Sequence, residues 1–112
     1  MSIQARTVQV NGTTAGVTAS IDANGMIRAV HLKPNTDAYT TRPLDDYLCT
    51  LKYQDAVIGV SPTGSRTASS IWYPGGVTAG LFVSSPVAGN VDVILTSIGI
   101  NGIVTVTLLV EQ

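Results

Sequence analysis

Strict alternation of apolar and other side chains constrains this chain most, and it is clearest between residues 91 and 110. The stretch VDVILTSIGINGIVTVTLLV holds one charged residue, Asp92, and consists mainly of Val, Ile, Leu and Thr. Its two arms, 91–96 and 103–110, alternate with a period of two, which is typical of β-strands. Asn101-Gly102 lies between the arms and suits the positive φ angles of a tight turn. The pattern predicts a β-hairpin.

The two faces of the second arm differ in character. One face is apolar throughout and predicts burial with Val91, Val93 or Ile94 of the first arm, as the register decides. The other face carries Thr105 and Thr107 beside Ile and Leu, where a wet strand would usually carry Lys, Glu or Arg. Either a second layer of the chain or a neighbouring chain covers this face. The residues predicted to be buried are Val104, Val106, Leu108 and Val110.

Short alternating runs between turn residues recur along the chain, and no run shows the 3.6-residue period of an amphipathic helix. We therefore expect residues 1–112 to form one all-β domain with almost no helix, a single-domain antiparallel β-sandwich or barrel, jelly-roll-like or Ig-like. About eight strands are expected. They span roughly residues 3–10, 16–22, 26–33, 47–59, 69–73, 79–84, 90–98 and 102–111.

Turn chemistry divides these runs. Asn11-Gly12, Asn24-Gly25 and Asn101-Gly102 each lie between two alternating runs, so each is a hairpin candidate. Polar or glycine-rich segments at 34–46, 61–69 and 73–80 predict three loops, which is where a small β domain carries its contacts.

Charged residues make up 12% of the chain, about half of the ~25% found in ordinary soluble domains. After Arg66 the remaining charged residues are Asp92 and Glu111. Part of this uncharged region must be core. The rest is suited to interface in a permanent assembly, because obligate interfaces are more apolar than free surfaces. We therefore expect a homo-oligomer or a lattice-bound subunit.

Several classes of partner are disfavoured by the sequence. No basic patch with interleaved aromatics indicates nucleic acid, and no stretch of ~20 apolar residues indicates a membrane span. The start MSIQARTVQV is strand-like and lacks the pattern of a secretory signal. Synthesis in the cytoplasm is expected, and the single Cys49 agrees with that compartment.

Enzymatic sites are also disfavoured. His31 falls in the alternating run IRAVHLK, where an exposed strand histidine is expected, and Cys49 is expected in or near the core, so a Cys/His dyad is not predicted. Asp45 and Asp46 are adjacent and would point to opposite sides of extended backbone, unlike paired glycosidase carboxylates. A calcium site built from Asp37, Asp45 and Asp46 stays open. The glycines of GSR and YPGGV lack the Lys and helix of a phosphate loop. No catalytic residue and no cofactor is predicted.

Interface candidates come from the loops and from the last strand. The 34–46 loop has no role in a core, yet it mixes aromatic, basic, apolar and acidic side chains. Trp72 is expected in the core more readily than at an interface, while Tyr73, before Pro-Gly-Gly, fits either place. The candidates are Tyr39, Arg42, Leu44, Asp45, Asp46, Trp72, Tyr73, Thr105 and Thr107.

The order of segments resembles small β-rich structural proteins of tailed bacteriophages. The segments are IQARTVQV, GVTASI, IRAVHLK, YLCTLKYQDAVIGVS, SIWYPGG, PVAGNVDV and GIVTVTLL, which together cover almost the whole chain. The resemblance implies a non-enzymatic virion protein, with a capsid decoration or cement role favoured and a neck, tail or baseplate position as the alternative. Its implied partners are the phage major capsid protein or other virion subunits, and its implied location is the virion. A carbohydrate-binding β-sandwich module is the alternative of another class.

Overall fold

The structure is a computed structural model of the chain, and it describes residues 2–12, 16–74, 77–78, 81–82 and 85–112. Every strand pairing is antiparallel. One turn of 3-10 helix, η1 (Tyr39–Thr41), interrupts the strands. The expected antiparallel all-β fold is confirmed. The strands are β1 (Ile3–Asn11), β2 (Val17–Pro34), β3 (Leu48–Tyr53), β4 (Ala56–Val60), β5 (Ser70–Trp72), β6 (Val77–Thr78), β7 (Leu81–Phe82), β8 (Ser85–Thr96) and β9 (Ile103–Glu111).

One sheet contains most of the strands, in the order β1-β9-β2-β8-β3-β4, with β5 also paired to β2. Strands β6 and β7 form a separate two-stranded hairpin. Within the described part of the chain, no helix is long and apolar enough to cross a bilayer.

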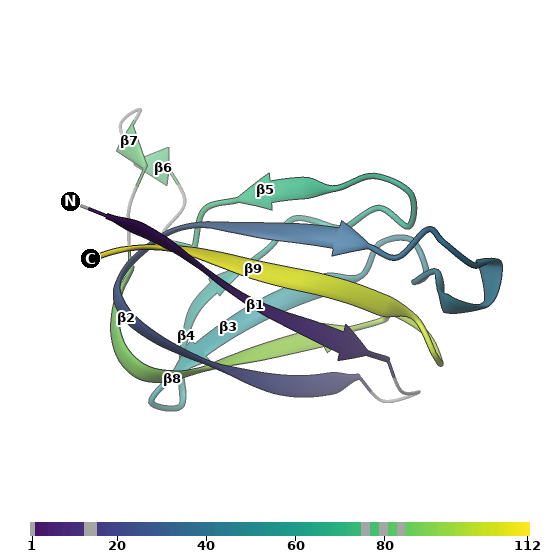
Figure 1. Ribbon diagram of the computed structural model, residues 1–112, viewed down its shortest axis with the longest axis horizontal. Coiled ribbons are helices and arrows are strands. Elements are labelled where there is room, and N and C mark those ends of the chain that lie inside the picture. The colour runs from purple at the N-terminus through teal and green to yellow at the C-terminus, as the bar shows by residue number, and fades with distance from the viewer. Residues whose placement is uncertain (1, 13–15, 75–76, 79–80, 83–84) are drawn as a thin grey trace.

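The long strand β2 folds this sheet over on itself. Its first part, residues 17–27, pairs with β8, whereas residues 26–34 pair with β9, and β5 adds to the same end. The strand bends near Gly25, whose φ of 136° lies in a region that glycine adopts easily. Figure 1 shows β2 curving at one end of the molecule, so that its two halves run on opposite sides.

The core lies between the two sides of the folded sheet. From β9 it receives the four residues predicted to be buried, each at most 1% exposed. Val91, Val93 and Leu95 of β8 meet them from the other side, together with Cys49 and Leu51 of β3. The predicted inner face of the last strand is therefore confirmed.

The predicted hairpin of residues 91–110 is wrong. Strand β8 pairs with β2 and β3, whereas β9 pairs with β1 and β2, so the two arms do not pair with each other. The turn at Asn101 does form, with φ of 63°. It carries the chain from one side of the folded sheet to the other, because the apolar faces of both arms are buried best when they face each other across the core.

The other two Asn-Gly predictions also fail as hairpins. Asn24-Gly25 lies inside β2, where the positive φ of Gly25 makes a bend in one continuous strand. Strand β1 pairs with β9 and not with β2, so Asn11-Gly12 does not join paired strands, and residues 13–15 lie outside the described part. Instead, Gly12 N–H donates to the Gly102 carbonyl at 2.7 Å, which joins two of the Asn-Gly segments to each other.

The strand predicted at 47–59 is two strands. β3 and β4 form a hairpin whose turn residues, Gln54 and Asp55, have φ of 51° and 64°. Two positive φ angles are the mark of a type I′ turn, which usually favours Asn and Gly. The strand predicted at 79–84 and the loop predicted at 73–80 lie partly outside the described residues.

Candidate functional site

The segment between β2 and β3 is a structured excursion at one end of the molecule (Figure 1). The Asp37 N–H donates to Asn35 Oδ1 at 2.8 Å, which makes a side-chain turn at the start of the loop. Both the N–H and the hydroxyl of Thr41 donate to the Ala38 carbonyl at 3.1 Å. The prediction that 34–46 forms a long excursion is confirmed.

Main-chain hydrogen bonds hold this loop against two other segments: the turn after β8 with the start of β9, and the loop after β4. These bonds place three segments that are distant in sequence side by side. They also fix the loop on the sheet, so its exposed side chains are presented by a rigid base. The bonds run from Asn35 N–H to the Ile103 carbonyl at 2.9 Å, from Leu44 N–H to the Ile98 carbonyl at 3.0 Å and from Asp46 N–H to the Gly64 carbonyl at 2.9 Å.

Tyr39 lies on the outer side of the loop and is 74% exposed. The guanidinium carbons of Arg42 and Arg66 lie 5.8 Å and 5.5 Å from the centroid of its ring, within the ~6 Å reach of a cation–π contact. The Nε atoms of both arginines are buried and have no hydrogen-bond partner among the described residues. Neither guanidinium pairs with a described carboxylate. Two cations thus flank one exposed aromatic ring.

Two exposed aliphatic side chains belong to the same end. Leu44 is 54% exposed and lies over Gly99, where an added Cβ would fall 2.9 Å from its Cγ. Ile100, next to Gly99, is 64% exposed. We call Tyr39, Arg42, Leu44, Arg66 and Ile100 the loop-end surface.

The acidic candidates have local roles in this loop. Asp45 Oδ1 accepts the main-chain N–H of Arg66 at 2.9 Å and so ties the two loops together. Asp46 has φ of 65° and lies at the turn into β3. Asp37 donates its N–H to Asn35. No three His, Cys, Asp or Glu side chains gather as metal ligands in the described part of the chain, so the calcium arrangement of Asp37, Asp45 and Asp46 does not form there.

Trp72 is 4% exposed and belongs to the core, so it is not an exposed anchor of the isolated chain. Tyr73 is half-buried. The two residues line an open groove of about 340 Å³ between β4 and β5, with Val60 and Ile71 more than half exposed at its rim. We call it the β4–β5 groove, and Pro62 completes its lining.

Thr105 and Thr107 lie half-buried on the outer face of β9, as their alternation with the core residues predicts. The Thr107 hydroxyl is 3.0 Å from that of Thr7 on β1. On the other side of β9, the residues of β2 in register are Lys33 opposite Thr105 and His31 opposite Thr107. Thr105 and Thr107 remain partly exposed, so the described residues of the chain do not form a second layer that covers this face.

Cys49 and His31 lie on opposite faces of the folded sheet. Cys49 is fully buried, and burial raises the pKa of its thiol to about 12, which suppresses the reactive thiolate. His31 lies on the outer face of β2, opposite Thr107 and Ile71.

Burial also raises the pKa of Tyr47 to about 12, and its hydroxyl has no described hydrogen-bond partner.

Arg66 and Ile100 are members of the loop-end surface that sequence reasoning missed. Arg66 falls in a loop that was predicted, but nothing local indicates that this loop folds back beside Tyr39. Ile100 lies in the turn after β8, where an apolar residue would be expected to serve the core. The available signal was an aliphatic residue between Gly99 and the Asn101-Gly102 turn.

No family model matches this chain, and no curated protein and no solved structure matches it either.

Proposed function

We propose that this chain is a non-enzymatic structural protein of a tailed-phage virion, acting as a capsid decoration or cement protein that attaches through its loop-end surface. The observation that carries the proposal is the composition of that surface. Tyr and Arg are the residue types enriched at the centres of protein interfaces, and here Tyr39 is flanked by two arginines that have no acidic partner among the described residues.

The mechanical setting of this surface supports the same function. A decoration protein gains its hold from many copies on a repeating lattice, so each contact needs to be only moderately strong. Hydrogen bonds to two neighbouring segments fix the loop before it binds, which lowers the ordering cost of each contact. The placement in a virion rests on the resemblance of the sequence segments, and a neck, tail or baseplate position would use the same chemistry.

The carbohydrate-binding alternative has less support from the aromatic side chains. Such a module needs exposed coplanar rings, but Trp72 and Tyr47 are buried. The hydroxyl of Tyr53 is held by the main chain of Ala88, as donor at 3.1 Å and as acceptor at 3.1 Å. Among the described aromatic side chains, Tyr39 alone is strongly exposed.

The test is co-sedimentation of the purified chain with virions that lack it. Arg42→Ala and Tyr39→Ala should each weaken attachment by about five- to thirtyfold, because truncating an interface anchor costs about 1–2 kcal/mol. Tyr39→Phe keeps the ring and should attach nearly as the parent does. Lys52→Ala is the matched control, since Lys52 lies on β3 near the opposite end of that strand from the loop.

Each variant should unfold at the parent's temperature, because none of the changed side chains is in the core. Equal attachment of Arg42→Ala and parent would remove the loop-end surface from the proposal. Failure of the parent to attach to any virion component would remove the virion function itself. A cryo-EM map of whole particles would separate head, neck, tail and baseplate positions, and specific binding on a glycan array would favour the carbohydrate alternative.

A further inference from the structure

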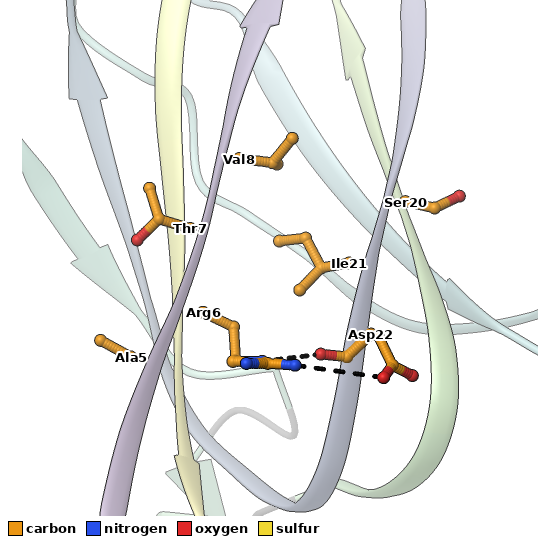
Figure 2. A pocket seen from close by; sticks show the side chains of 7 residues that line it. All are labelled: Ala5, Arg6, Thr7, Val8, Ser20, Ile21 and Asp22. Atoms are coloured by element: carbon orange, nitrogen blue, oxygen red, sulfur yellow. Dashed lines mark hydrogen bonds and ion pairs between the residues drawn. The ribbon is translucent and has the colours of Figure 1, made fainter.

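Among the described strands, β1 and the first half of β2 each have an edge without a neighbouring strand, and these two edges face each other. Within that part of the chain, β1 pairs with β9 alone, and residues 17–25 of β2 pair with β8 alone. Between the edges lies an open groove of about 280 Å³, shown in Figure 2. We call it the β1–β2 seam, and its lining consists of Ala5, Arg6, Thr7, Val8, Ser20, Ile21 and Asp22.

Main-chain groups of β1 point into this seam. Gln112 N–H donates to the Ser2 carbonyl at 3.0 Å, which places the bonded pairs of the β1–β9 ladder at even-numbered residues of β1. In an antiparallel ladder, the residues between bonded pairs direct both N–H and C=O to the other edge. Ala5 and Thr7 therefore present their main-chain groups to the seam.

The same reasoning applies to β2. The Asp22 carbonyl accepts Arg6 Nε–H at 2.9 Å, and the Asn24 carbonyl accepts from Gln112 Nε2 at 3.4 Å. The carbonyls of these even-numbered residues thus point away from β8 and towards β1. By alternation the Ser20 carbonyl points the same way. In Figure 2 the side chains of Val8 and Ile21 point into the gap, while those of Thr7 and Ser20 point away from it.

The side chain of Arg6 spans the gap between the two strands. Directly paired strands would instead be joined by main-chain hydrogen bonds. The two edges still approach closely, because some Cα atoms of β1 and β2 lie within 8 Å of each other. An inserted strand needs about twice the ~4.8 Å spacing of paired strands, so the edges must spread to admit one. The second contact, from Arg6 to the Asp22 carboxylate, is 4.0 Å long and exposed, so it holds the gap weakly.

We propose that the β1–β2 seam is a strand-acceptor site that takes an extended segment of another protein. Facing rows of main-chain donors and acceptors recognise an extended backbone, which is strand addition. Val8 and Ile21 select apolar side chains at alternate positions of the occupant. Arg6 and Asp22 have opposite charges, so the seam favours an occupant without net charge. An inserted strand pairs along both of its edges. A second copy is not the donor, because each strand in the described part of the chain already has at least one edge paired.

The site does not depend on the proposed function, so its test uses a designed probe. The peptide KTVTVTVTE alternates Val for the apolar floor with Thr for the outer face, and its terminal Lys and Glu keep it soluble without a net charge. Titration at about millimolar concentration, followed by amide NMR of the labelled chain, should shift Ala5, Thr7, Ser20 and Asp22. The same peptide with N-methyl groups on alternate main-chain nitrogens should bind at least tenfold more weakly, because it cannot complete the ladder.

Two protein variants complete the test. Arg6→Ala frees the Asp22 carbonyl and should bind the peptide about two- to tenfold more tightly, the worth of one competing hydrogen bond. Thr7→Pro removes an N–H that faces the seam while sparing the β9 ladder, and it should bind at least tenfold more weakly than Thr7→Ala. Absence of shifts at the seam, equal binding of the N-methylated peptide, or shifts confined to the free edge of β4 at residues 56–60 would each overturn the proposal.

Discussion

A methyl group at Gly25 tests whether the bend of β2 is what folds the sheet. Gly25 has φ of 136°, and a Cβ there would collide with the main-chain carbonyl O of Glu111 and lie 3.1 Å from its carbon. The obstacle is backbone of the paired strand β9, which cannot rotate away as a side chain can. Gly89 on β8 is the matched control, since its φ is 118° but an added Cβ would have nothing within 4 Å.

The two substitutions separate conformational strain from collision. At Gly89, Ala pays about 1–3 kcal/mol for the positive φ, offset by ~0.4–1 kcal/mol from the less flexible unfolded chain. We therefore expect Gly89→Ala to lower the free energy of unfolding by about 1–2 kcal/mol. At Gly25 the collision adds about 1–3 kcal/mol of overpacking, for a total loss of about 2–5 kcal/mol. That is a large share of the ~5–15 kcal/mol typical of a domain.

Urea denaturation followed by circular dichroism measures both losses, with the slope m reporting whether unfolding stays cooperative. Gly25→Ala should reach its midpoint at a clearly lower urea concentration than Gly89→Ala. Equal midpoints would show that the β9 backbone shifts to admit the methyl group with no loss of stability. The bend would then not be fixed by the contact with Glu111. A parent-like midpoint for both variants would refute the role of positive φ as well.

Two further predictions concern single polar groups. Tyr47→Phe should leave the free energy of unfolding unchanged or raise it by about 1 kcal/mol, because the buried hydroxyl has no described partner; a loss of similar size in urea denaturation would contradict this. Arg28 binds Glu111 through two bonds of 2.7 Å and 2.9 Å, and the hydrogen bond from Arg28 holds the pKa of Glu111 below its ordinary value. That stability is present above the ordinary pKa of 4.5 and is lost as pH falls through the lowered pKa, so the difference between parent and Glu111→Gln should shrink in acid. A difference that is constant from neutral to acid pH would count against the pair.

Local patterns predicted the strands well where one face is buried, and β9 is the clearest case. Its alternation places Val104 and Val106 in the core and Thr105 and Thr107 outside, as the structure shows. This works because the side-chain period of a strand is a local property. The partner of a strand is not local, which is why the paired arms expected at 91–110 lie on different sides of the core.

The Asn-Gly pairs show the same limit from another direction. An Asn-Gly dipeptide indicates that the backbone can adopt a positive φ at that point. A positive φ is equally required by a turn, by a bend in one strand and by a crossing between layers. Gly25 serves the bend, and Asn101 serves the crossing. The real hairpin between β3 and β4 turns on Gln54 and Asp55, whose positive φ angles are held by the paired strands rather than favoured by their own chemistry.

The four arginines show how a chain with few charges divides them between fold and recognition. Arg6 bridges two strand edges, and Arg28 forms a two-pronged pair with Glu111 at the bulge of β2. Arg42 and Arg66 have no described acidic partner and meet at an exposed ring. The planar fork of arginine suits both tasks, while lysine would supply a point charge without the stacking face. Removal of the first two should therefore act on the closure and stability of the sheet, whereas removal of the second two changes what the loop-end surface can hold.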